Sequence, residues 1–592
     1  MKSKLAHTFR ALIPGLLIVF TMFFLCPSCN KPEPASMVIL NGKILTVDST
    51  FSIAEALAIR DSKILAVGSN KEIRKLAKGQ TRVIDAGGRT VIPGLIDAHL
   101  HPGMAALSEL EEAIPDIRSM DELLAWIESQ TSLKEEGKWI VFPKFFFTRL
   151  VEMRQPSLSE LDLVAPRHPV FLNGSFGGMI NSAALQVAGI SEKTVHPGVL
   201  KDELTAKPTG FIRASAFSLL KLAPPSQLSP EEYENAFLDM LKRYNQYGIT
   251  SLCSGADDLD GFALYKRLGE EGRLSVRIHQ NMILRRNSTT KVSALVEEIR
   301  ALDCKTGDGD EWARIGAVKV FLDGGILTGT AYLREPWGEK AEEVYGFDDT
   351  AYRGIVNYSR DELLEIVSAA AERDWKFAAH CTGGGAVDLL LDVYEEVNRI
   401  HPIRDRRFSI IHGNFFTPQA IQRMSELGVY ADMQAAWFYK DADAMRAILG
   451  EERIRHFLPY RSLIDAGVLV NGGSDHMVKW DASASINPYN PFLAMWAMIT
   501  RTTERNSVIL PGEAITRMEA LQIYTINHAH ASFEEELKGS LLPGKLADLV
   551  LLSDDFLNCP VERIRDIRAD MTLVGGKIVY RSADMEQAAA GQ

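Results

Sequence analysis

The hydrophobic and polar positions divide the chain into a long central region and two shorter flanks. In the central region, short apolar runs alternate with stretches of helical periodicity such as residues 361–373 and 418–427. Eight apolar runs are predicted to be buried strands: residues 91–98, 248–254, 276–283, 316–322, 377–380, 408–412, 429–432 and 468–472. Alternating strands and helices of this number predict an α/β fold with a closed parallel (β/α)8 barrel.

The two flanks predict one small β domain beside the barrel. Short strands separated by Gly, Asp and Ser turns are expected at residues 36–42, 44–48, 56–60, 63–68 and 81–85, and again at 548–552, 570–574 and 577–580. Each group is small for an independent domain. We therefore expect residues 36–90 and 536–583 to form the two parts of one β-sandwich, with the barrel spanning residues 91–535.

A large insertion is predicted after the first barrel strand, at about residues 105–235. The gap between the first and second strands is much longer than an ordinary connection between a strand and the next helix. The insertion contains several aromatic residues: Phe142, Phe145, Phe146, Phe147, Phe171, Phe176 and Tyr233. These side chains are expected either to contact a substrate or to form the core of the insertion.

Composition excludes some classes of partner. The chain has 592 residues, a formal charge of −12 and 46% apolar residues. No basic stripe is present to neutralise phosphates, so we expect no nucleic-acid partner. Four of the six cysteines lie beyond the N-terminal region, and their spacing does not suggest a disulfide framework. Among them, Cys381 directly follows His380 and is predicted to point away from it into the core.

The N-terminus is predicted to be an export signal spanning residues 1–28. Three cationic residues precede an apolar segment at 11–26 that is shorter than the ~20 residues of a spanning helix. Cys29 follows the small residue Ser28, as at the junction of a bacterial lipoprotein, although Cys26 stands where an aliphatic residue is usual. We expect an exported protein of the cell envelope, lipid-anchored at Cys29. A permanent membrane anchor is the alternative.

Potential metal ligands recur where the predicted strands end. His99 and His101 are two residues apart on one strand, so both side chains point to the same side. Three more ligands end later strands: His380, His412 and Asp475. The carboxyl ends of barrel strands meet on one face, where these nitrogen and oxygen donors suit zinc or a similar divalent ion.

Several motifs carry a resemblance to a known family. These are Pro93-Gly-Leu-Ile-Asp-Ala-His-Leu-His101, Asn181-Ser-Ala-Ala-Leu185, the stretch 316–332, Gly473-Ser-Asp475 and the stretch 539–552. Over residues 36–580 the chain resembles the amidohydrolase superfamily, and in particular its family 3 branch of metal-dependent amide hydrolases. The resemblance implies a barrel with a β-sandwich and one or two metal ions. Residues 175–180 and 209–214 depart from the family pattern, which leaves the substrate open.

Lys319 is a further candidate ligand, because an unpaired ammonium inside an apolar strand is costly. In related binuclear enzymes the lysine of the fourth strand is carboxylated and bridges two metals, which the resemblance implies for Lys319. An ion pair with Asp323 and a substrate-binding ammonium are the alternatives.

The leading hypothesis is an exported hydrolase that cleaves a carbon–nitrogen bond of a small amide or N-substituted amide. A metal with an open position activates water, and Asp475 is the expected general acid and base. The alternatives are an aminohydrolase, a cyclic imide or lactone hydrolase, and a non-catalytic surface lipoprotein that binds a ligand. A homodimer is compatible with each of these hypotheses.

Overall fold

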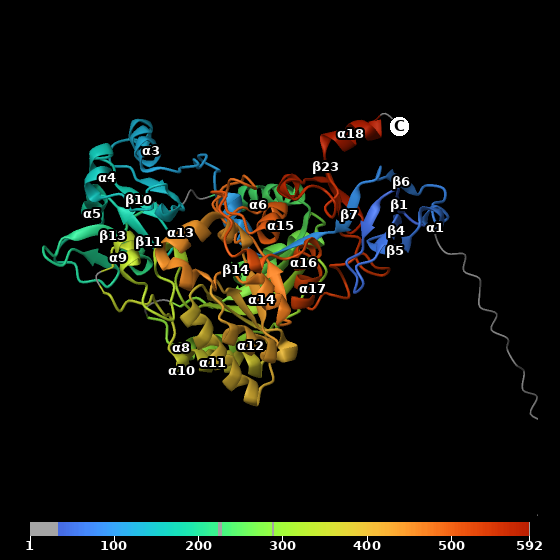
Figure 1. Ribbon diagram of the computed structural model, residues 1–592. Coiled ribbons are helices and arrows are strands. Elements are labelled where there is room, and N and C mark those ends of the chain that lie inside the picture. The colour runs from blue at the N-terminus through green and yellow to red at the C-terminus, as the bar shows by residue number, and fades with distance from the viewer. Residues whose placement is uncertain (1–33, 223–227, 287–288, 348, 591–592) are drawn as a thin grey trace, which may run out of the picture.

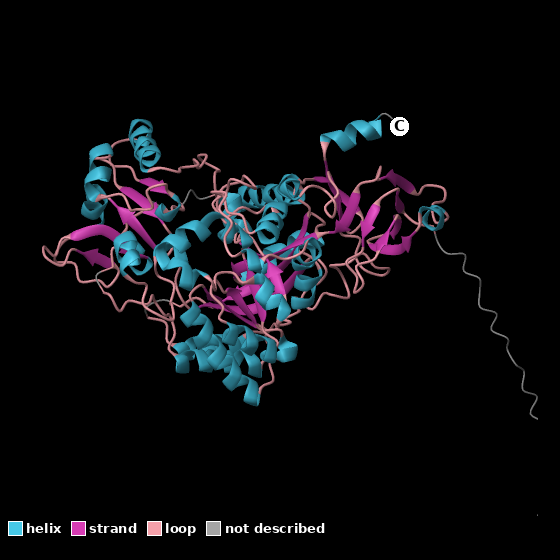
Figure 2. Cartoon of the chain, in the orientation of Figure 1, coloured by secondary structure: helices cyan, strands magenta, loops and turns pink. Residues whose placement is uncertain are grey.

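A barrel of eight parallel strands forms the centre of the molecule, which confirms the predicted (β/α)8 fold. The computed structural model describes residues 34–222, 228–286, 289–347 and 349–590, so the predicted signal and Cys29 lie outside the described residues. Figure 2 shows the barrel strands in the middle with helices outside them. The strands, in spatial and chain order, are β8 (Leu95–Leu100), β14 (Ile249–Asp257), β15 (Arg277–Ile283), β16 (Ala313–Phe321), β17 (Phe377–Cys381), β18 (Ser409–His412), β19 (Tyr430–Met433) and β20 (Val470–Gly472).

Contacts just after β20 bring the last strand back to the first. The backbone N–H of Asp475 donates to the carbonyl of His99 at 2.7 Å. Beside it, the backbone N–H of Ser474 donates to the buried carboxylate of Asp97 at 3.0 Å. These bonds join the carboxyl ends of β8 and β20, so the ring is nearly closed at the face where the candidate ligands lie.

Most of the outer helices begin at a side-chain cap. Ser229 and Glu232 form a capping box at the start of α6 (Pro230–Asn245), and Ser359 and Glu362 do the same for α10 (Arg360–Glu372). Other helices around the barrel are α7 (Leu259–Glu270), α8 (Val292–Ala301), α11 (Gly384–Ile400), α12 (Pro418–Leu427), α13 (Ala435–Ile454), α14 (Tyr460–Asp465), α15 (Pro491–Thr500), α16 (Arg517–Ile523) and α17 (Ile526–Ala531). Within the described ranges, no helix is both long and apolar enough to cross a membrane.

Strands from the two ends of the chain form a small β domain beside the barrel. One sheet contains β5 (Lys63–Gly68), β4 (Ala56–Arg60), β1 (Met37–Leu40) and β6 (Arg82–Asp85). The other contains β23 (Lys577–Arg581), β22 (Ala569–Val574), β21 (Leu549–Leu552), β7 (Thr90–Pro93), β2 (Lys43–Leu45) and β3 (Ile53–Ala54). The N- and C-terminal strands meet where β7 pairs antiparallel with β21, with Ile92 opposite Val550.

The predicted first barrel strand, residues 91–98, is wrong as a single element. The chain leaves the β domain after β7 and enters the barrel at β8, with Gly94 between the two strands. A Cβ atom on Gly94 would lie 2.1 Å from the Thr250 hydroxyl oxygen, so only glycine fits this close crossing. A continuous apolar run in the sequence hides the change because both strands are buried.

The segment between β8 and β14 forms a separate sheet with its own helices. The sheet order is β12 (Val199–Lys201), β13 (Pro208–Arg213), β11 (Gly177–Ile180), β10 (Val170–Asn173) and β9 (Ile140–Phe142). It is accompanied by α3 (Met120–Leu133), α4 (Leu158–Val164) and α5 (Ser182–Ala188), whereas α2 (Pro102–Leu107) packs against α6. In Figure 1 this sheet and the β domain lie on opposite sides of the barrel.

A buried ion pair joins the barrel to the β domain. Arg277, at the start of β15, donates from Nε and Nη2 to the two carboxylate oxygens of Asp548 at 2.7 and 3.0 Å. Both side chains are at most 4% exposed. A bidentate pair of this kind fixes orientation as well as distance, so it determines how β21 sits against the barrel wall.

Candidate metal centre

The fold brings together all six side chains that the sequence singled out as potential ligands. They lie at or near the carboxyl ends of barrel strands: His99 on β8, His101 just after it, Lys319 on β16, His380 on β17, His412 on β18 and Asp475 three residues after β20. All six line one cavity. Strand direction accounts for this convergence, because every carboxyl end of a parallel barrel points to the same face.

Asp475 lies at the centre of the first group of ligands. Its Oδ1 atom is 3.2 Å from Nε2 of His101 and 3.6 Å from Nε2 of His99. The ligand atoms of these three residues all lie within 4.8 Å of one another. Carboxylate and imidazole donors at this separation can bind one divalent ion.

The second group lies against the first. The rings of His380 and His412 have centroids 4.5 Å apart, and the His412 ring is 5.3 Å from that of His99. Lys319 bridges the space, with Nζ 3.4 Å from Nε2 of His99. The six side chains therefore form one continuous cluster rather than two separate sites.

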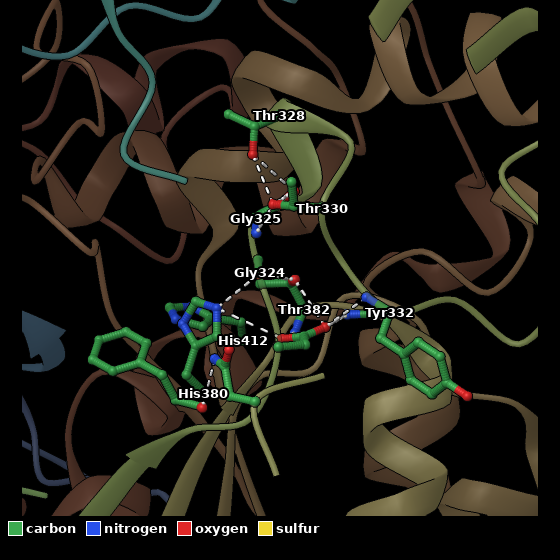
Figure 3. Close-up of polar contacts among 12 residues, drawn as sticks. Gly324, Gly325, Thr328, Thr330, Tyr332, His380, Thr382 and His412 are labelled. Carbon is green, nitrogen blue, oxygen red and sulfur yellow. Dashed lines mark hydrogen bonds and ion pairs between the residues drawn. The ribbon is translucent and has the colours of Figure 1, made fainter. Parts of the chain in front are cut away.

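Hydrogen bonds at the outer nitrogens fix which imidazole atoms face the cluster. Nδ1 of His412 lies 2.7 Å from Oε1 of Gln434, and Nε2 of His380 lies 2.9 Å from the Gly324 carbonyl oxygen. Figure 3 shows the contact of His380 with Gly324. Because both partners are acceptors, these nitrogens carry the hydrogens and leave His412 Nε2 and His380 Nδ1 with lone pairs. His380 Nδ1 is buried without a partner in the described part of the chain.

The ring protonation states also fit a metal. Burial lowers the pKa of His412 to about 4 and holds the pKa values of His99 and His380 well below the ordinary histidine range. These imidazoles are therefore neutral at neutral pH, the form that binds a metal. Donor chemistry, orphaned nitrogens and protonation states together fit a resident divalent ion.

Asp475 is held by its backbone as well as its side chain. Its φ of +54° is in the left-handed region, and Asn487 Nδ2 donates to its carbonyl oxygen at 2.8 Å. Burial raises the pKa of Asp475, but the hydrogen bond from His101 and the nearby positive charges outweigh burial and bring it to about 2. The carboxylate is therefore ionised at neutral pH.

Lys319 does not pair with Asp323, which removes one of the three explanations for its burial. Asp323 instead accepts backbone N–H bonds from Tyr332, Thr382 and Gly383 at 2.7–3.0 Å. The labelled Tyr332 and Thr382 of Figure 3 belong to this network. Lys319 is completely buried, and burial lowers its pKa to about 8 against the opposing effect of Asp475. A carbamate and a substrate-binding ammonium are the two explanations that remain.

A cavity of about 210 Å³ opens above the cluster. Its apolar wall is formed mainly by Met104, Phe146, Phe176, Phe321, Ile326, Leu327, Trp437 and Met477. Of the insertion aromatics, Phe146 and Phe176 line this cavity. Phe142, Phe145, Phe147 and Phe171 are buried in packing, and Tyr233 stacks on Phe237. The insertion thus supplies part of the wall, while most of its aromatics form a core.

Three residues near the cluster were not predicted from the sequence. Lys144 comes from the insertion and lines the cavity. Trp437 stacks on His412 with a centroid distance of 4.7 Å, and Gln434 holds the same ring. Gln434 directly follows β19, so the strand-end rule could have found it. Lys144 lies outside the barrel, and nothing in the local sequence places it near the cluster. Cys381 is buried in the core as predicted.

Fold and site together define a metal-dependent hydrolase barrel, and comparison with known proteins places it in a family. The model of the amidohydrolase family matches residues 82–580. The N-substituted formamide deformylase of Arthrobacter pascens is 30% identical over 564 residues, covering 92% of this chain and 98% of the relative. The putative amidohydrolase YtcJ of Bacillus subtilis is 25% identical, covering 92% and 99%. The chain belongs to the amidohydrolase family, in its family 3 branch, and is an enzyme of that class.

Solved structures show the same fold at lower identity. An uncharacterized metal-dependent hydrolase from Pyrococcus horikoshii superposes with a TM-score of 0.64 at 21% identity, covering 89% of this chain and 99% of that one. A zinc complex of the atrazine chlorohydrolase TrzN from Arthrobacter aurescens gives 0.51 at 16% identity, covering 94% and 98%. Both are similarities of fold.

Proposed function

We propose that the protein hydrolyses the carbon–nitrogen bond of small N-substituted amides, with N-substituted formamides as the leading substrate class. The observation that carries the proposal is the convergence of the six ligands at the base of a small, largely apolar cavity. The whole-length similarity to an N-substituted formamide deformylase supports the choice of acyl group. A formyl carbon bears only hydrogen, so it is the acyl group least restricted by a cavity of about 210 Å³.

The residues that would hold metal form two groups according to their position in the cavity. His99, His101 and Asp475 would hold one ion, and His380 and His412 would hold a second, with Lys319 between them. A bound divalent ion supplies acidification of a water molecule and polarisation of the carbonyl group. Zinc fits the donor set best.

Asp475 performs the proton transfers in the proposed reaction. Its ionised carboxylate accepts a proton from the attacking water as the new carbon–oxygen bond forms. It then delivers that proton to the amide nitrogen as the carbon–nitrogen bond breaks, which releases a carboxylic acid and an amine. Asn487 and the backbone bond to His99 keep the carboxylate directed into the cluster.

The cavity wall selects the nitrogen substituent. Phe146, Phe176 and Trp437 present apolar faces on which an alkyl or arylalkyl group can pack. Lys144 is the cationic group of this wall. Its Nζ lies 2.7 Å from Met477 Sδ, a weak acceptor that satisfies a buried ammonium poorly. We infer that Lys144 donates to a polar oxygen of the substrate.

The test is a substrate panel in which each member changes one feature. Amine release is measured for an N-arylalkyl formamide and the matching acetamide, ring opening for a cyclic imide and a lactone, and ammonia release for a ring amidine. The proposal expects amine and formate in equal amounts, with the formamide turned over fastest. Ammonia release from the ring amidine, with no amine from either amide, would instead assign the site to an aminohydrolase.

A further inference from the structure

A second group of potential metal ligands lies inside the barrel, apart from the candidate metal centre. It consists of Cys253 on β14, His279 on β15 and His528 on α17, and their ligand atoms all lie within 4.8 Å of one another. Cys253 and His279 are direct neighbours across the parallel strand pair. His528 reaches them from α17, with its ring centroid 6.1 Å from that of His279.

These three side chains are buried, and the two rings have no hydrogen-bond partners. Cys253 is 2% exposed, and His279 and His528 are each 4% exposed. In the described part of the chain, neither ring nitrogen of His279 or of His528 has a partner. A buried nitrogen left unpaired costs free energy. One nitrogen of each ring lies within 4.8 Å of the Cys253 sulfur, and a bound ion would give both of these nitrogens a partner.

The local packing leaves room for the His279 ring. A Cβ atom on Gly316, in the neighbouring strand β16, would lie 2.9 Å from Cε1 of His279. Glycine at this position therefore permits the imidazole to lie against the strand.

We propose that Cys253, His279 and His528 bind one thiophilic metal ion, a site separate from the hydrolytic centre. A thiolate and two imidazoles suit zinc and monovalent copper. Ligand distances of ~2.0–2.3 Å for zinc require the donor atoms to approach to within ~4 Å of one another, so small side-chain rotations close the site. The ion joins strands β14 and β15 to α17, and so attaches that helix to the barrel.

The surrounding charges favour a complex of low net charge. Lys376 donates to the Ala531 carbonyl at 3.0 Å beside the cluster. Its positive charge lowers the pKa of both histidines. The negative charge of Asp432 raises the pKa of Cys253 and that of Lys376. Lys538 pairs with Glu534 at 2.9 Å, and Arg314 lies 3.8 Å from Glu534. A monovalent ion with a thiolate adds no charge, whereas a divalent ion adds one positive charge. The site is therefore expected to prefer the monovalent ion.

The test uses the sulfur ligand as a label, because none of the proposed ligands in the hydrolytic centre contains sulfur. The metal-free full chain is titrated with Ag⁺ and, separately, with Cd²⁺, and the ultraviolet thiolate-to-metal charge-transfer band is recorded. The same titrations are made on Cys253→Ser and on the matched control Cys381→Ser, which removes another buried thiol. In the parent and the control we expect a charge-transfer band that saturates at one equivalent of ion per chain. The band should be absent from Cys253→Ser. Ag⁺ is expected to bind more tightly than Cd²⁺.

Two further measurements keep the result interpretable. With the hydrolytic centre loaded with zinc beforehand, binding of Ag⁺ is expected to raise the melting temperature of the parent by several degrees, and to leave that of His528→Asn unchanged. Anomalous diffraction from Cd²⁺-loaded or Ag⁺-loaded parent crystals locates the ion even where a variant does not fold. An equal band in Cys253→Ser, or no anomalous peak between Cys253 and His279 with either ion, would overturn the proposal.

Discussion

Asp475 is the residue on which the proposed proton transfers depend. In Asp475→Asn the amide keeps the size of the side chain but cannot accept a proton, so turnover is expected to fall by about 10²–10⁴-fold. Steady-state hydrolysis of a formamide and circular dichroism measure activity and fold. Asp481→Asn, an exposed position in the following loop, should behave like the parent. Near-parental turnover in Asp475→Asn would give the proton transfers to another group.

A substitution of Lys319 distinguishes between the two chemical forms that remain for this side chain, a carbamate and an ammonium. We propose the carbamate, because it would supply anionic oxygens to both ions where a buried cation is disfavoured. The parent is then expected to bind about two ions per chain, and Lys319→Ala to lose activity that short carboxylic acids partly restore. Metal content and rescue are measured with acetate and, in parallel, with a short alkylamine. Rescue by the amine alone would show that the positive charge is what the site uses.

The six residues of the cluster could be predicted from the sequence because each lies within or just after an apolar run that ends at the same face of a barrel. Lys144 and Trp437 could not be predicted in this way. Lys144 reaches the cavity from the insertion, and its position depends on how that sheet packs on the barrel. Trp437 lies in the first turn of α13, where an aromatic residue is equally compatible with helix packing.

At the level of elements, the eight strands were predictable because each is short, apolar and bounded by turns. The division of residues 90–100 between β7 and β8 was not predictable, because the residues on both sides of Gly94 are buried and form one uninterrupted apolar run. The pairing of β7 with β21 joins segments more than 450 residues apart, and local pattern carries no information on such a register.

The Arg277–Asp548 pair makes the contact between barrel and β domain testable. In Arg277→Met the Asp548 carboxylate stays buried without its partner, which is expected to lower the free energy of unfolding by about 3–5 kcal/mol. Denaturant unfolding measures the loss. Arg167→Met removes a well-exposed partner of Glu136 and is expected to cost less than about 1 kcal/mol. Equal losses in the two variants would mean that the buried pair contributes nothing specific.

For the whole molecule, we propose that the protein is exported and lipid-anchored at Cys29. The proposal is supported by the cationic start, the short apolar segment and the small residue Ser28 before the cysteine. In a bacterial host the mature protein is expected to begin at a lipid-modified Cys29, and Cys29→Ala to prevent the modification. Mass spectrometry of the N-terminus checks both. An intact N-terminus, or cleavage elsewhere with unmodified Cys29, would contradict the proposal.

The central claim is that the histidines at the strand ends hold the metal on which hydrolysis depends. The most direct measurement is the metal content and the formamide turnover of the same preparations of parent, His99→Ala, His412→Ala and the control His401→Ala, whose histidine lies outside the cavity. Parent and control are expected to bind metal and to lose activity on chelation, whereas both strand-end variants bind less metal and are inactive. Full metal content and full activity in both His99→Ala and His412→Ala would contradict the account.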